Sequence, residues 1–186
     1  AAAAAVPVLT QALTARSVEV RNFAVDALGR IGPAAAASVP AILKEVDLPK
    51  DHGNYVPLAF FRLLAARALG RIGPEARQAI PLLQATLQSD DVAYRVAAAV
   101  AMWKIARHEA ALPTLTAIIR DDPPRGPYEA ILALADFGDA AEPATELLVT
   151  TLGSKHPDHR RAAAEVLTQR DVDAMLPVAQ RLRAKT

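Results

Sequence analysis

The sequence has no cysteine, only 4% aromatic residues and almost no excess of either charge. Without cysteine the chain can form no disulfide, no thiolate metal site and no thiol nucleophile. The scarcity of aromatic residues argues against a β-sandwich or a β-barrel, since strands favour aromatic and β-branched side chains. A net charge of +1 is too small to attract nucleic acid or an anionic membrane surface. We therefore expect neither of these partners.

Long apolar runs are also missing. No run approaches the roughly 20 residues that cross a bilayer, and the opening segment Ala1–Ala5 lacks the positive flank of a secretion signal. We therefore expect a cytoplasmic chain with no membrane insertion. A length of 186 residues suits one ordinary domain, so we expect a single domain over residues 1–186, which can itself be a fragment of a longer protein.

Alanine is what the sequence has in abundance. It contributes 42 residues to a hydrophobic content of 52%. Alanine is the best helix former, and its small side chain lets neighbouring helices approach closely. The composition therefore predicts an all-α protein.

An internal repeat is the strongest pattern in the chain. The segment Ala27–Pro33 recurs unchanged as Ala68–Pro74, 41 positions later. Degenerate copies follow, and the five copies have apolar anchor residues spaced by 41, 33, 32 and 33 positions: Leu28, Leu69, Met102, Leu134 and Leu167. Repeats of this length are typical of stacked helical hairpins.

The residue seven positions before each anchor is arginine in four of the five copies. These residues are Arg21, Arg62, Arg95 and Arg160, with Pro127 in the remaining copy. A shared arginine at a fixed position supports the alignment of the copies. It also predicts a common structural or binding role for the four side chains.

Each copy is predicted to form two helices. The first begins near a proline, as at Val6-Pro7 and Val39-Pro40, because the first helical turn tolerates proline. The second begins after polar capping residues, such as Ser89–Asp91 or Pro157-Asp158. It ends at a Gly-Pro pair, where glycine supplies the left-handed cap and proline starts the next helix. We expect about five helical hairpins, with an extra helix near each end.

The pattern of a Val-Pro-x-Leu-Leu helix, an acidic turn and a Val-Arg-x-x-Ala-x-x-Ala-Leu-Gly-x-Ile-Gly helix resembles HEAT repeats. The closest matches are Val20–Gly32 and Asp91–Ala106, and the similarity is greatest to the short bacterial units of the phycobilin-lyase-like type. The resemblance implies a right-handed α-α superhelix, an armadillo-like solenoid of about five hairpins, with Leu69 buried. The fourth and fifth copies depart from the pattern at Pro127 and Arg170, so the fifth is expected to be a polar cap.

The same resemblance implies a role for the shared arginines. In HEAT proteins this position usually belongs to a ladder of aspartate and arginine that ties neighbouring units. Asp90 or Asp91 and Asp121 or Asp122 are the expected partners in this chain. We favour this structural role over ligand binding.

Histidine and glutamate offer only weak metal-binding patterns. A single His-Glu pair, His108-Glu109, lies before a first helix, and a metal would need several converging ligands. His156 and His159 are three positions apart, but Pro157 between them favours a surface pair over a metal site. We therefore expect no metal, no cofactor and no catalytic residue.

Nucleic-acid chemistry is also not favoured. HEAT-like DNA glycosylases line a concave face with aromatic and basic residues, whereas this chain has one tryptophan and no basic run. Trp103 occupies the position of Gly29 and Gly70 in earlier copies, which favours a packing role. We expect a non-enzymatic scaffold that binds a protein or peptide; the alternative is lyase-like or chaperone-like handling of a prosthetic group.

The partner is expected to bind a stripe on the concave face of the second helices. Positions two before the shared arginine and one, five and nine after it lie along one helical face. An apolar strip with a basic edge along this stripe would suit an apolar peptide with an acidic flank. The competing interpretation is that these residues are core, and solvent exposure distinguishes the two. The residues are Arg30, Phe60, Leu63, Arg67, Arg71, Val96, Val100, Lys104, Tyr128 and Leu132.

The long spacing between the first two anchors predicts an excursion within one hairpin, over residues 47–57. This segment is rich in turn-forming residues and includes Asp51, His52, Asn54 and Tyr55. A loop held on a rigid scaffold is a common recognition site, but an insertion without function is an equal alternative because long loops cost little entropy. The sequence predicts neither the identity of the partner nor the oligomeric state.

Overall fold

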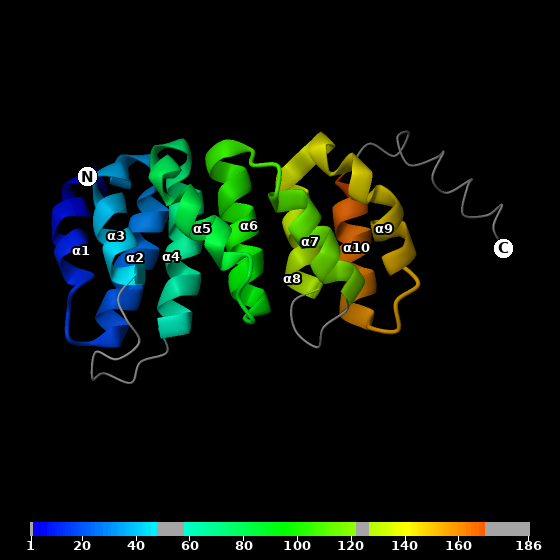
Figure 1. Cartoon of the computed structure of the whole chain (residues 1–186), viewed down its shortest axis with the longest axis horizontal. Helices are drawn as coiled ribbons and strands as arrows, with labels where there is room; N and C mark the ends of the chain where they lie inside the picture. Colours follow the sequence, from blue (N-terminus) through cyan, green and yellow to red (C-terminus); the bar gives the residue numbers. More distant parts are fainter. Residues whose placement is uncertain (1, 48–57, 122–126, 170–186) are drawn as a thin grey trace. The chain divides into compact units, whose positions relative to one another are not determined.

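The computed structural model describes residues 2–47, 58–121 and 127–169, and these ranges contain helices and turns but no strand (Figure 1). This confirms the all-α class, and the packing of the helices is consistent with an α-α solenoid. The chain divides into two compact units, Ala1–His108 and Glu109–Thr186. Each unit is described by itself below.

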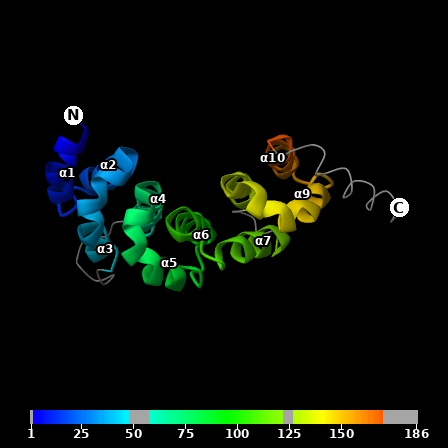
Figure 2. The same ribbon diagram turned by 90° about the horizontal axis from the view of Figure 1, so that it is seen from above.

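In the first unit the described residues, 2–47 and 58–108, form three helical hairpins. They are α1 (Val6–Ala12) with α2 (Val18–Ile31), α3 (Val39–Asp47) with α4 (Leu58–Ile72), and α5 (Ile80–Thr86) with α6 (Val92–Ala106). Short 3-10 segments η1 (Ala2–Ala5), η2 (Gly32–Ser38) and η3 (Gly73–Ala79) precede the hairpins. The second helices α2, α4 and α6 pack side by side in one layer, and each first helix packs on its own second helix (Figure 2).

The described residues of the second unit, 109–121 and 127–169, form two hairpins. They are α7 (Ala111–Asp121) with α8 (Pro127–Ala133), and α9 (Thr145–Thr151) with α10 (Pro157–Thr168), joined by the 3-10 segment η4 (Leu134–Ala144). The helices α8 and α10 pack against each other, as consecutive second helices do in the first unit. The hairpins therefore correspond to the five copies of the sequence repeat. Arg170, assigned to the polar cap, lies outside the described residues.

Polar side chains begin the second helices, as the sequence predicts. The Ser17 hydroxyl accepts a hydrogen bond from the Val20 amide at the start of α2, and the Asp91 carboxylate accepts one from the Tyr94 amide at the start of α6 (both 3.2 Å). Each cap satisfies an amide that has no partner within the helix. In the fifth hairpin the predicted cap is wrong, because Pro157 is the first residue of α10 and the cap position is occupied by His156.

Glycine ends α2 and α4 in a backbone conformation that other residues rarely adopt. The φ angles of Gly32 and Gly73 are +73° and +84°, which confirms the predicted glycine caps. One expectation is wrong: the proline after each glycine does not begin the next first helix. It is the second residue of a 3-10 segment that begins at the glycine, and the α-helix starts later, at Val39 or Ile80.

The anchor residues form the core. Leu69 is 1% exposed, as predicted, and the other four anchors are also buried. The second helices approach closely through glycine: a β-carbon on Gly29 would lie 2.7 Å from the Cα of Ala68, and one on Gly70 would lie 2.9 Å from the Cα of Ala101. These distances are too short for real β-carbons. Glycine is therefore required where α2 meets α4 and where α4 meets α6.

Candidate binding surface on the second helices

The predicted stripe is solvent-accessible on α4. Phe60 is 49% exposed, Arg67 and Arg71 are exposed, and Leu63 is half-buried. These four residues recur at helical spacing along the side of α4 that is not covered by other helices. The helix thus presents one large aromatic ring and two guanidinium groups to solvent.

The neighbouring helices extend this surface with two further cations. Arg30 near the end of α2 and Lys104 near the end of α6 are exposed, and Val100 of α6 is half-buried. We call the set of Arg30, Phe60, Leu63, Arg67, Arg71, Val100 and Lys104 the second-helix face. Its exposed charged members are all basic.

Val96 does not belong to this face. Its side chain is only 5% exposed, so its assignment to an open surface is wrong and the competing core interpretation holds there. Its three successors Ala97, Ala98 and Ala99 are also buried, whereas Leu63 and Leu64 at the matching place on α4 are half-buried. More of the circumference of α6 is therefore closed to solvent, and the stripe that is open on α4 narrows on α6.

Tyr128 and Leu132 are half-buried in the second unit. Arg161 of α10 donates a hydrogen bond from Nη2 to the Tyr128 hydroxyl (3.4 Å), and its guanidinium lies 5.9 Å from the centre of the Tyr128 ring. The hydrogen bond to Tyr128 raises the pKa of Arg161. Tyr128 therefore contributes to packing between α8 and α10 within its own unit.

Arg71 is paired with an acidic residue of the preceding hairpin. Its guanidinium lies 2.9 Å from a carboxylate oxygen of Asp26 on α2, and both side chains remain partly exposed. Asp26 is half-buried at the edge of the second-helix face. Arg30, which occupies the position of Arg71 in the first hairpin, has no ion-pair partner within the described ranges.

Three of the four shared arginines bind backbone carbonyls instead of aspartates. Arg21 donates to the Ala15 carbonyl (2.6 Å), Arg62 to the Val46 carbonyl (3.2 Å) and Arg160 to the Ser154 carbonyl (2.8 Å). Each acceptor lies at or just after the end of the first helix of the same hairpin, where carbonyls lack helical partners. The expected aspartate ladder between units is therefore wrong for these three arginines. Their role is structural, as predicted.

Trp103 stands where α2 and α4 have their closely packed glycines. It is half-buried near the end of α6, and the guanidinium of Arg107 lies 4.7 Å from the centre of its ring. A cation above an indole ring is a favourable electrostatic contact. At this position α6 therefore has an aromatic ring in contact with the Arg107 guanidinium, whereas α2 and α4 have a glycine that lets the next helix approach closely.

The two histidines at the start of α10 and the predicted recognition loop are not part of the second-helix face. The rings of His156 and His159 lie 4.8 Å apart and are tilted by 48°; within the described ranges, no three or more His, Cys, Asp or Glu side chains gather where they could hold a metal ion. The predicted recognition loop lies outside the described residues, and so do its four named members: Asp51, His52, Asn54 and Tyr55.

The comparisons with known proteins support the fold and identify no binding residue. No helix among the described residues is long and apolar enough to span a membrane, and no curated protein matches the chain. Residues 61–135 match the family model described as HEAT repeats. This segment begins in α4 and ends in η4, so it includes Arg67, Arg71 and Lys104. The match and the stacked helical hairpins together support a HEAT-repeat protein.

Proposed function

We propose that the chain is a non-enzymatic scaffold that binds an acidic protein segment or peptide on its second-helix face. The observation that carries this proposal is that exposed Arg30, Arg67, Arg71 and Lys104 lie near the ends of three adjacent helices, on the same stripe that carries the exposed ring of Phe60 near the start of α4. HEAT repeats commonly serve as scaffolds for protein interactions, which supports the same class of function.

The chemistry of the face favours one kind of ligand. Basic side chains on three adjacent helices attract carboxylates and accelerate encounter with an acidic partner. Phe60, with half-buried Leu63 and Val100 nearby on the stripe, provides apolar surface that an anchor residue of the partner can cover. Because the residues lie on packed helices, the face is held rigid before the partner binds.

The alternative is the handling of a prosthetic group, as the resemblance to phycobilin-lyase-like units implies. It is a separate prediction, which a titration with free bilin or haem tests directly. A saturable change in visible absorbance at one ligand per chain would favour it. Absence of catalysis and a cytoplasmic location also remain proposals.

A peptide selection tests the scaffold function. The purified chain is used to select from a library of displayed random peptides, and selected peptides are measured by fluorescence anisotropy. We expect enrichment of sequences that combine Asp or Glu with one or two large apolar residues. Reversing two charges, in Arg67→Glu with Lys104→Glu, should weaken binding of these peptides by roughly tenfold or more.

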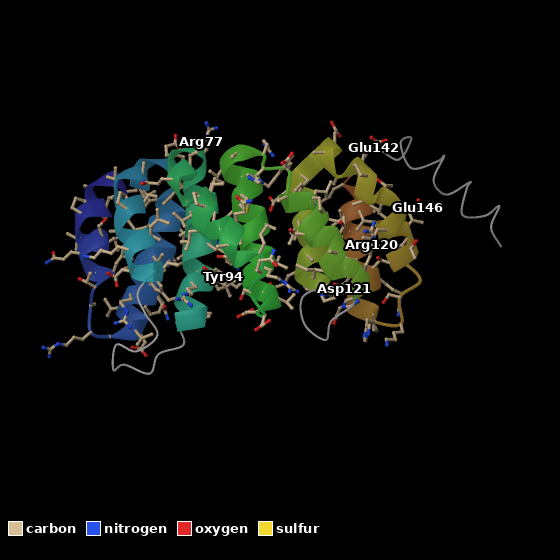
Figure 3. All side chains as sticks on the ribbon, viewed as in Figure 1. Arg77, Tyr94, Arg120, Asp121, Glu142 and Glu146 are labelled. Carbon is tan, nitrogen blue, oxygen red and sulfur yellow. The ribbon has the colours of Figure 1, made fainter. Side chains whose placement is uncertain are left out.

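The matched control reverses a charge outside the face. Arg77 is exposed in η3, where Figure 3 shows it pointing outward, so Arg77→Glu should leave the affinity within about twofold. Circular dichroism checks that all variants keep their helical content. Selected peptides without acidic residues, or equal loss of affinity in Arg77→Glu, would contradict the proposal.

A further inference from the structure

The side of the first hairpin that faces away from α3 and α4 is unusually apolar. Phe23 of α2 is 76% exposed, Val20 of α2 is 44% exposed and Val8 of α1 is 70% exposed. Val20, Phe23, half-buried Ala27 and exposed Arg30 recur at helical spacing along one side of α2, which we call the first-hairpin end face. Exposed apolar side chains gathered on one side of a hairpin indicate an interaction surface.

Two of these positions, those of Val20 and Ala27, are covered in the next two hairpins. Val20 corresponds to Phe61 and Tyr94, which are 4% and 9% exposed; Figure 3 labels Tyr94 near the start of α6. Ala27 corresponds to Ala68 and Ala101, which are fully packed.

The cover for these positions is the preceding second helix. The nearest atoms to a β-carbon on Gly29 belong to Ala68, and those to a β-carbon on Gly70 belong to Ala101. Ala27 lies two residues before Gly29, so it points to the opposite side of α2. The end face therefore continues, in register, the interface that joins α2 to α4.

The positive charge of Arg30 on the end face also matches the charge at the same place in the α2–α4 interface. In the α2–α4 interface, Asp26 of the preceding hairpin pairs with Arg71 of the following one (2.9 Å). Arg30 corresponds to Arg71 and has no ion-pair partner in the described part of the chain. A further hairpin packed on this face would supply a partner for Arg30 if it had an acidic residue at the position that Asp26 occupies in the first hairpin.

We propose that the first-hairpin end face binds one more helical hairpin of this repeat type. The second helix of that hairpin carries a carboxylate and a glycine three positions apart, as Asp26 and Gly29 do. The glycine packs on Ala27, the carboxylate pairs with Arg30, and the hairpin covers Val20 and Phe23. Arg30 lies at the border of the two surfaces and belongs to both, whereas Val20, Phe23 and Ala27 belong to the end face alone, so this inference does not depend on the proposed function.

A second copy of the chain fits this description poorly. Its Asp26 and Gly29 already pack against its own α4. The corresponding pair in α6 is Val100 and Trp103, and the pair in α10 is Glu165 and Thr168. Tryptophan and threonine both have a β-carbon where Gly29 has none, so neither helix can approach Ala27 as closely.

The test adds the proposed hairpin to the full chain. Residues 2–38 are duplicated and joined directly to Val6, so that the added Ser38 leads into Val6-Pro7 as it natively leads into Val39-Pro40. The added copy carries Phe23→Asp, which gives its peptides a distinct mass and removes its own exposed apolar ring. Hydrogen exchange of the original α2 is then measured by mass spectrometry.

We expect amide exchange in the original α2 to slow by roughly tenfold or more relative to the unextended chain. Two controls change only the proposed contacts: Gly29→Leu in the added copy, and Arg30→Glu in the original copy. The first should abolish the protection and the second should reduce it. Unfolding in urea, followed by circular dichroism, checks that the extended chain folds and should show a raised midpoint.

Two results would overturn the proposal. Exchange in the original α2 that is unchanged, or protected equally in the Gly29→Leu control, would show that the added hairpin does not pack there. Sedimentation of the unextended chain provides the other test. A dimer that is lost in Phe23→Asp would mean that a second copy, and not a further hairpin, occupies the face.

Discussion

At the scale of single residues, a missing β-carbon sets how closely the second helices of the first unit approach. Glycine inside a helix normally costs stability relative to alanine, by about 0.5–1 kcal/mol. Glycine is nevertheless required at Gly29 and Gly70, because a β-carbon at either position would lie within 3 Å of the backbone of the next helix. Tight packing therefore reverses the usual preference for alanine.

We predict that Gly29→Ala and Gly70→Ala destabilise the first unit, although both raise helix propensity. The added methyl forces α2 from α4, or α4 from α6, and overpacking of this kind costs about 1–3 kcal/mol. The free energy of unfolding is measured in urea. As a control, Gln84→Ala on the exposed side of α5 should change it by no more than about 0.5 kcal/mol. Stabilisation by either glycine substitution would show that the helices separate at little cost.

The shared arginines give a second prediction at this scale. Arg21 donates to the Ala15 and Arg16 carbonyls between α1 and α2. Arg21→Met keeps much of the aliphatic stem but removes the donors, so it should lower the free energy of unfolding by about 1–3 kcal/mol. Arg16→Met removes the same charge from an exposed side chain without such bonds, and its effect in the same urea titration should stay below about 0.5 kcal/mol. Equal effects would mean that charge alone matters.

At the scale of elements, the beginning of α2 is stabilised by two linked polar contacts. The Ser17 hydroxyl accepts from the Val20 amide and donates to the Glu19 carboxylate (2.7 Å). The hydrogen bond from Ser17 holds the pKa of Glu19 below its usual range. A lowered pKa in the folded state means that the ionised carboxylate favours folding. This contribution is present at neutral pH and is lost as the pH falls through the pKa of Glu19.

We predict that Ser17→Ala returns the pKa of Glu19 toward its usual value, since the main cause of the shift is removed. An NMR titration of the Glu19 carboxyl carbon measures it. The helix also loses its cap, and the free energy of unfolding should fall by about 0.5–2 kcal/mol. An unchanged titration of Glu19 would mean that the hydroxyl does not donate to the carboxylate in solution.

The pair between Asp26 and Arg71 links two hairpins and predicts a small coupling. Because both side chains are partly exposed, a double-mutant cycle with Asp26→Asn and Arg71→Met should give a coupling energy of about 0.2–1 kcal/mol. The coupling should fall when urea unfolding is repeated in high salt. A coupling independent of salt would indicate that packing of the side chains, and not charge, joins them.

At the scale of the whole molecule, stability within the first unit is expected to depend on neighbouring hairpins. Leu69 is buried in α4, which packs against both α2 and α6. Leu69→Ala should therefore cost about 2–5 kcal/mol and accelerate hydrogen exchange in all three helices. Faster exchange confined to α4 would show that the hairpins unfold independently. Phe60→Ala is the control, because half of that side chain is already exposed.

Local patterns in the sequence are enough to predict the class of fold, the hairpin repeat, the glycine caps and the burial of the anchors. These follow from local rules: helical periodicity, proline in first turns, glycine at positive φ and polar caps act within a few residues of each other. The sequence could not determine the partners of the shared arginines, because carbonyls at helix ends are present in every hairpin and have no signature in the sequence.

Which stripe residues are open to solvent depends on how the helices pack, and the stripe pattern does not predict it. Val96 and Leu63 occupy the same position in their copies, but α6 is covered where α4 is not, so Val96 is core and Leu63 is half-buried. Phe23 shows the opposite case, since its pattern is that of a packed helix and only the lack of a described helix against it leaves the ring in solvent. Burial depends on what packs against a helix as well as on its own periodicity, and that information lies in residues far apart in the chain.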